Sequence, residues 1–138
     1  MKSHRDYSDN EFESIFEDRE FPVSLFNHEA HLRLAYLHLK KYGRKEAINN
    51  VCNQLKSYVQ KLGAEEKFNV TLTIAAIRAV EHFMDKSGSD NFDGFIAENP
   101  RLNSNFKELM AMHYGFDIYI STEAKEKFLE PDLLPFDD

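Results

Sequence analysis

The chain of 138 residues contains little cysteine, proline and glycine, and it contains no tryptophan. Cys52 is the single cysteine, so an internal disulfide and a zinc site built on cysteines are both excluded. No apolar run approaches the ~18 residues that a membrane-spanning helix needs. The N-terminal segment is polar and does not resemble a secretory signal. We therefore expect a cytoplasmic protein with no membrane partner.

Clusters of basic residues are also missing. The chain has 17 Lys and Arg against 24 Asp and Glu, which gives a net charge of −7. Proteins that bind nucleic acid rely on clustered Lys and Arg to neutralise phosphates, and here the basic residues are scattered. The composition therefore predicts no nucleic-acid partner. The length and the hydrophobic content of 42% fit one folded domain over residues 1–138.

Strand patterns are absent as well, because apolar and polar residues do not alternate strictly over any useful length. Apolar residues recur at helical spacing instead. This spacing predicts an all-α fold, an irregular single-domain bundle of about six to seven helices. The expected helices cover about residues 8–19, 27–43, 48–62, 64–86, 90–98, 102–113 and 121–129. The apolar tail with Pro131 and Pro135 is expected to lie across the bundle as an extended strap.

Three of the six histidines, His28, His31 and His38, lie close together in the second expected helix. At about 100° per residue, His31 and His38 fall within roughly 20° of each other, and His28 lies about 60° further round. They share an apolar arc, whereas Glu29 and Arg33 fall on the opposite, polar arc. Buried imidazole nitrogens need hydrogen-bond partners or a chemical use. We predict that His31 is more buried than His38.

His28 and His31 are three residues apart and could chelate a divalent metal ion from one helix face. A third ligand would come from His113 or His82. The spacing is one residue short of the zincin pattern His-Glu-x-x-His, and no carboxylate on the same arc supplies an extra ligand. Hydrogen-bonded histidines at the edge of the core are the simpler interpretation of the same pattern.

Asn69 and Thr73 lie one turn apart on the buried face of the helix expected over residues 64–86. Thr73 can bond to the carbonyl one turn earlier and Asn69 can bridge two helices, or both can line a cavity with the histidines. His113 lies at the end of a helix, where it caps the helix dipole or serves the same cavity.

Five short segments carry a further pattern. They are Phe26-Asn27-His28-Glu29-Ala30-His31-Leu32, Thr71-Leu72-Thr73, Asn99-Pro100, His113-Tyr114, and the stretch from Ser121 to Pro131 with its Pro-Asp-Leu ending. Together they resemble a family of small bacterial all-helical proteins over about residues 26–135. The resemblance implies an all-α fold and a bacterial, cytoplasmic setting, and it implies no particular activity. A histidine is common in that family where Asn69 stands here, so the resemblance also implies that this chain has lost one candidate metal ligand, which weakens the case for a metal site.

Our leading hypothesis is a small helical protein whose internal cavity binds a small ligand or a metal ion. The cavity would be lined by His28, His31, Asn69, Thr73 and His113. The alternative is a structural or protein-interaction module without catalytic activity, in which the histidines are hydrogen-bonded core groups. Neither a glycine-rich phosphate loop nor a serine-centred elbow points to an enzyme. The sequence does not indicate whether a protein partner or a second copy of the chain is bound.

Overall fold

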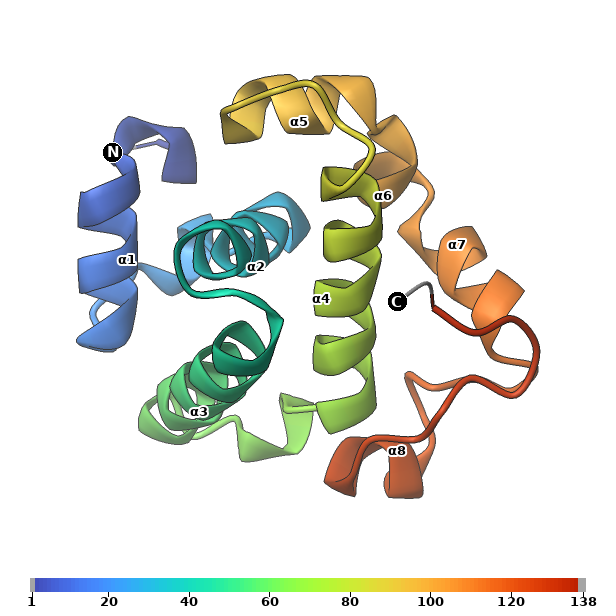
Figure 1. Cartoon of the computed structure of the whole chain (residues 1–138). Coiled ribbons are helices and arrows are strands. Elements are labelled where there is room, and N and C mark those ends of the chain that lie inside the picture. Colours follow the sequence, from blue (N-terminus) through green and yellow to red (C-terminus); the bar gives the residue numbers. More distant parts are fainter. Residues whose placement is uncertain (1, 137–138) are drawn as a thin grey trace. The chain divides into compact units, whose positions relative to one another are not determined.

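The chain is all-helical in a computed structural model that describes residues 2–136 (Figure 1). Its α-helices are α1 (Asp9–Glu17), α2 (His28–Tyr42), α3 (Arg44–Lys61), α4 (Val70–Met84), α5 (Phe92–Glu98), α6 (Pro100–Ser104), α7 (Phe106–His113) and α8 (Thr122–Glu126). Three short 3-10 helices are η1 (His4–Asp6), η2 (Val23–Leu25) and η3 (Glu65–Lys67). No strand occurs between residues 2 and 136. The predicted all-α fold class is confirmed.

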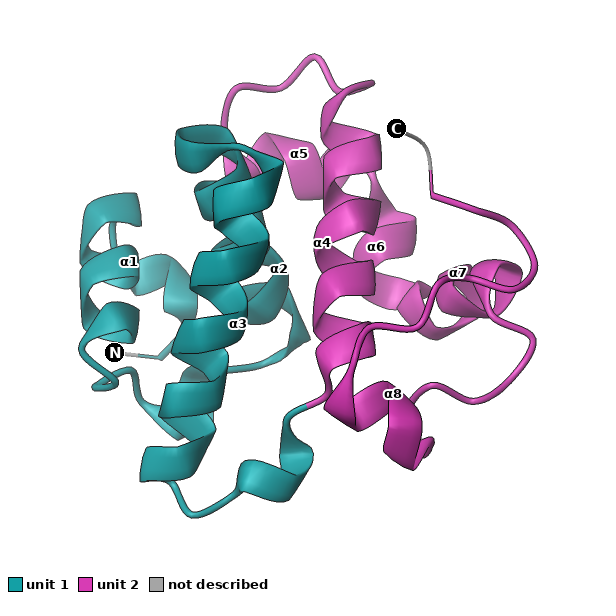
Figure 2. Ribbon diagram, turned by 60° about the horizontal axis from the view of Figure 1, so that its bottom comes forward, with its two compact units in different colours: residues 1–68 teal, residues 69–138 magenta. Residues whose placement is uncertain are grey.

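The helices belong to two compact units, residues 1–68 and residues 69–138 (Figure 2). Compact units of this size can belong to one domain, so the single domain expected from the sequence stays a prediction. In the part of the chain that the structure describes, no helix combines the length and the apolar character that crossing a bilayer requires.

Polar caps and a glycine fix the helix ends in the first unit, as the sequence predicts. Ser8 and Glu11 form a capping box at the start of α1. Asn27 begins α2, because its Oδ1 accepts a hydrogen bond from the Ala30 amide at 2.8 Å. Gly43 ends α2 with a φ of 86°, a conformation that favours glycine. Local sequence signals therefore determine these boundaries.

Two boundaries in the second unit differ from the prediction. The helix expected over residues 64–86 begins at Val70, because Asn69 is its N-cap and not an interior residue. Asn69 Oδ1 accepts from the Leu72 amide at 2.9 Å. The helix expected over residues 102–113 begins at Pro100 and is interrupted at Asn105, whose φ of −128° and ψ of 33° are not helical. The interruption gives eight α-helices in the described residues where six or seven were expected.

Helix α2 is buried around most of its circumference and packs against α1 and α3. Every residue from Leu32 to Leu39 is buried, and Arg33 is only 6% exposed. The predicted polar arc is therefore wrong at Arg33. The physical reason is that the N-terminal segment covers this side of the helix, which periodicity within one helix does not reveal.

Arg33 holds the N-terminal segment on α2. Its Nη1 donates to the His4 carbonyl oxygen at 2.6 Å, and its Nη2 donates to the Tyr7 carbonyl oxygen at 2.8 Å. Nη2 also pairs with the Asp9 carboxylate at 2.9 Å. The guanidinium carbon lies 4.7 Å from the centre of the Phe12 ring, within the range of a cation–π contact. Carbonyl groups, a carboxylate and an aromatic ring of the chain itself thus compensate the buried charge of Arg33.

In the second unit, α4 packs against α8, and α6 packs against both α5 and α7. The C-terminal tail runs along the end of α7 as an extended strap, as predicted. The Leu133 amide donates to the His113 carbonyl oxygen at 3.0 Å, and the Gly115 amide donates to the Asp132 carboxylate at 2.8 Å. A Cβ atom at Gly115 would lie 3.0 Å from that carboxylate, so the close approach favours glycine.

Candidate functional site

His28 and His31, the two predicted metal ligands, lie in the first turn of α2. Burial, and then the charge of His28, lowers the pKa of His31 to about 4. His31 is therefore neutral near pH 7, which is the form that binds metals. Its buried Nε2 has no hydrogen-bond partner within the described chain. Between residues 2 and 136, however, no three His, Cys, Asp or Glu side chains are arranged to hold a metal ion. The metal site at these two histidines stays a prediction.

His38 is the more buried of the two neighbouring histidines. It is 1% exposed, whereas His31 is half-buried. The prediction that His31 is more buried is therefore wrong, since α1 packs against α2 and places Glu13 and Glu17 near His38. Burial lowers the pKa of His38, and the carboxylates of Glu13 and Glu17 on α1 oppose that shift. The ring centre of His38 lies 5.3 Å from that of Tyr42.

Asn69 and Thr73 use their polar atoms to hold the chain together at the start of α4. Thr73 Oγ1 donates to the Asn69 carbonyl oxygen at 2.7 Å, which is the bond to the preceding turn that the sequence allowed. Asn69 Nδ2 donates to the Ile118 carbonyl oxygen at 2.8 Å. Asn69 thus joins α4 to the segment after α7, and not to a second helix. Both side chains are satisfied without a ligand.

His113 is the predicted site residue that lines a cavity. Its Nδ1 donates to the Leu134 carbonyl oxygen at 2.7 Å, and its ring stacks on Phe136 with the ring centres 4.2 Å apart. This hydrogen bond places the single ring proton of a neutral His113 on Nδ1 and leaves a lone pair on Nε2. His113 therefore fastens the strap to the end of α7.

The cavity beside His113 lies entirely within the second unit, between α4, α6, α7 and the strap. We call it the strap groove. Its volume is about 380 Å³, which is in the lower part of the range for small-molecule sites, ~300–1,000 Å³. Its apolar wall includes Phe83, Leu109, Met112 and Leu134. The groove therefore has both the size and the apolar surface that a small organic ligand requires.

Among the residues that the structure describes, every titratable side chain that lines the strap groove is basic. They are His82, Lys86, Arg101 and His113. The surrounding unit has the opposite character, because residues 69–138 contain six Lys and Arg and thirteen Asp and Glu. Both histidines of the unit line the groove, and no acidic residue between 69 and 136 does. The groove is thus a basic site within an acidic unit.

The two permanent charges of the groove remain exposed. Within residues 2–136, neither Lys86 nor Arg101 forms an ion pair with a carboxylate. Arg101 Nη2 contacts the Met112 sulfur at 3.1 Å, and a thioether is a weak acceptor. An anion could therefore replace this contact at little cost.

Sequence reasoning missed Lys86 and Arg101, to which it gave no role. It considered His82 as a candidate third metal ligand beside His28 and His31. One signal in the sequence pointed to this groove: residues 69–138 contain an apolar tail, which must cover some helix surface, and only two histidines. The sequence could not indicate which side chains the tail would meet.

Comparison of the chain with protein-family models, with curated proteins and with solved structures finds no match. The resemblance to a family of small bacterial all-helical proteins therefore stays a prediction, and only the geometry of the site bears on function.

Proposed function

We propose that the protein binds a small amphipathic anion in the strap groove, a molecule with a carboxylate head group and an apolar body. The observation that carries this proposal is the lining of the groove, which within residues 2–136 combines an apolar wall with four basic side chains and no acidic one. This ligand class narrows the small-ligand hypothesis from the sequence, and it keeps His113 as a site residue.

Arg101 and Lys86 bind the head group in this proposal. The planar guanidinium of Arg101 matches a carboxylate through two parallel hydrogen bonds, and the Lys86 ammonium adds a point charge. An anionic ligand would thus meet permanent charge from Lys86, just after α4, and from Arg101 in α6.

The apolar wall explains why the ligand has an organic body. Phe83 and Leu109 line the groove from two helices, and Leu134 lines it from the strap. Burial of apolar ligand surface against them contributes ~25 cal/mol per Å². An inorganic anion would leave this surface unused, so we expect it to bind more weakly than a carboxylate with a hydrocarbon chain.

Octanoate and 1-octanol test the proposal, because they share a chain and differ in the charge of the head group. We expect octanoate to shift the amide resonances of α7 and the strap in a titration followed by NMR, with an affinity about tenfold or more above that of octanol. Arg101→Gln should weaken octanoate binding about tenfold. Lys127→Gln, which removes a charge elsewhere in the same unit, is the matched control and should leave the affinity unchanged.

Equal affinities for octanoate and octanol would contradict the proposed charge recognition. Shifts confined to residues outside the strap groove would contradict the proposed location. If neither compound binds, the structural or protein-interaction module becomes the better interpretation of the fold.

A further inference from the structure

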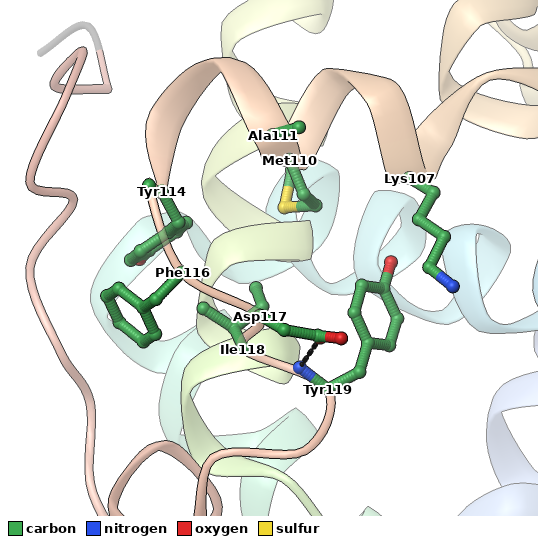
Figure 3. Close-up of a pocket in the computed structure, with 9 residues that line it drawn as sticks. Lys107, Met110, Ala111, Tyr114, Phe116, Asp117, Ile118 and Tyr119 are labelled. Atoms are coloured by element: carbon green, nitrogen blue, oxygen red, sulfur yellow. Dashed lines mark hydrogen bonds between the residues drawn. The ribbon is translucent and has the colours of Figure 1, made fainter.

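A second cavity lies in the same unit, between α7 and the segment of residues 115–119 that follows it (Figure 3). Its volume is about 290 Å³. We call it the aromatic pocket, because Tyr114, Phe116 and Tyr119 line it together with Met110 and Ile118. Phe116 is 40% exposed, so part of this aromatic surface faces solvent. None of these residues lines the strap groove.

The Tyr119 ring already accepts a cation from the chain itself. The Lys107 ammonium lies 5.2 Å from the centre of that ring, within the ~6 Å range of a cation–π contact (Figure 3). Lys107 is exposed and extends from the second position of α7. The ring is therefore placed where a positive group can approach its face, and Lys107 occupies that position in the absence of a ligand.

Carboxylates lie beside the aromatic pocket, which Lys107 also lines. Asp117 lines it, and Asp132 contacts Gly115 at its edge. Burial raises the pKa of Tyr119, and the charges of Asp117 and Glu108 raise it further. Burial is also the first cause that raises the pKa of Tyr114; the charge of Glu130 raises it further, and that of Arg78 opposes the shift. The carboxylates around Tyr119 disfavour an anion in this pocket.

We infer that the aromatic pocket binds a small organic cation, an ammonium group that carries alkyl substituents. The aromatic faces attract such a cation through their quadrupoles, the carboxylates compensate its charge, and Met110 and Ile118 contact its alkyl groups. The ligand competes with the Lys107 ammonium for the face of Tyr119. This site is independent of the strap groove, because its residues differ and its ligand has the opposite charge.

Choline and 3,3-dimethylbutan-1-ol form a matched pair of probes, because a carbon atom in the alcohol replaces the charged nitrogen of choline. In NMR titrations of the full chain, we expect choline to shift the amide resonances of residues 115–119 and to bind about fivefold or more tightly than the alcohol. Equal affinities, or choline shifts elsewhere only, would overturn the inference.

Two variants give opposite expected changes and therefore test the geometry. Lys107→Met removes the internal competitor and should tighten choline binding about threefold. Asp117→Asn removes a charge but keeps the Oδ1 that accepts from the Tyr119 amide at 2.9 Å, and it should weaken binding by a similar factor. Lys125→Met is the control for Lys107→Met, and Asp85→Asn is the control for Asp117→Asn, because each control makes the same change of charge away from the pocket. Weaker binding in Lys107→Met, or no change in either variant, would refute the proposed site.

Discussion

The substitution Arg33→Met should release the N-terminal segment from α2. Methionine retains much of the aliphatic stem of arginine but removes the guanidinium that joins α2 to His4, Tyr7 and Asp9. The contact therefore disappears with little change in packed volume. Local release of residues 2–8 and a loss of global stability are both expected.

The magnitude follows from the individual contacts of Arg33. Each hydrogen bond from a charged donor to the His4 or Tyr7 carbonyl oxygen contributes ~1.5–3 kcal/mol. The pair with Asp9 adds little, because that carboxylate is 63% exposed. Water can reach the two carbonyl groups once the segment detaches, which limits the loss. We expect the free energy of unfolding to fall by about 3 kcal/mol.

Urea denaturation followed by circular dichroism measures this change, and hydrogen exchange locates it. The backbone amides of Asp6 and Tyr7, which donate to the Ser3 and His4 carbonyl oxygens, should lose protection in Arg33→Met. Lys45→Met removes an exposed charge from the same unit and serves as the control. A loss below about 1 kcal/mol together with unchanged protection of these amides would show that Arg33 does not hold the segment.

Three further predictions concern the core, the histidines and the strap. Leu55→Ala should cost about 2–5 kcal/mol in urea denaturation, because Leu55 is buried in α3, and a cost below about 0.5 kcal/mol would contradict this placement. Burial lowers the pKa of His31 in the folded chain to about 4, from an ordinary value of 6.5. As the pH falls, the unfolded chain therefore binds a proton at His31 before the folded chain does. Up to about 3 kcal/mol of the free energy of unfolding should be lost between pH 6.5 and 4. The free energy of unfolding of His31→Gln, measured as a function of pH, should lack this loss. An identical pH profile in the variant and the original chain would show that His31 does not cause it. Gly115→Ala should push the Asp132 carboxylate away and speed hydrogen exchange at the Leu133 amide, whereas unchanged exchange would mean that the strap adjusts without loosening.

Most of the helical pattern could be predicted from the sequence, because it depends on local signals. The Ser8 capping box, the Asn27 cap and Gly43 each act within one turn of the chain. The start of α4 was misplaced because Asn69 can serve as a cap or as an interior polar residue, and apolar spacing does not distinguish the two. The burial of Arg33 was missed for a different reason, since its partners lie 24 to 29 residues away.

The candidate site was harder to predict, because its residues meet only through tertiary contacts. His113 was singled out from the sequence, and the strap was expected. The hydrogen bond from His113 to the Leu134 carbonyl oxygen of the strap was not expected. Lys86 follows α4, Arg101 lies in α6, and both carry ordinary surface side chains. Only the position of the strap shows that they border the same apolar groove.

The most direct test of the proposed function is the position of bound octanoate, measured through intermolecular NOEs. We expect NOEs from the alkyl chain of octanoate to the side chains of Phe83, Met112 and Leu134, which line the strap groove. These NOEs should weaken in Arg101→Gln. NOEs to residues 2–68 alone, or to the aromatic pocket, would contradict binding of the anion in the strap groove.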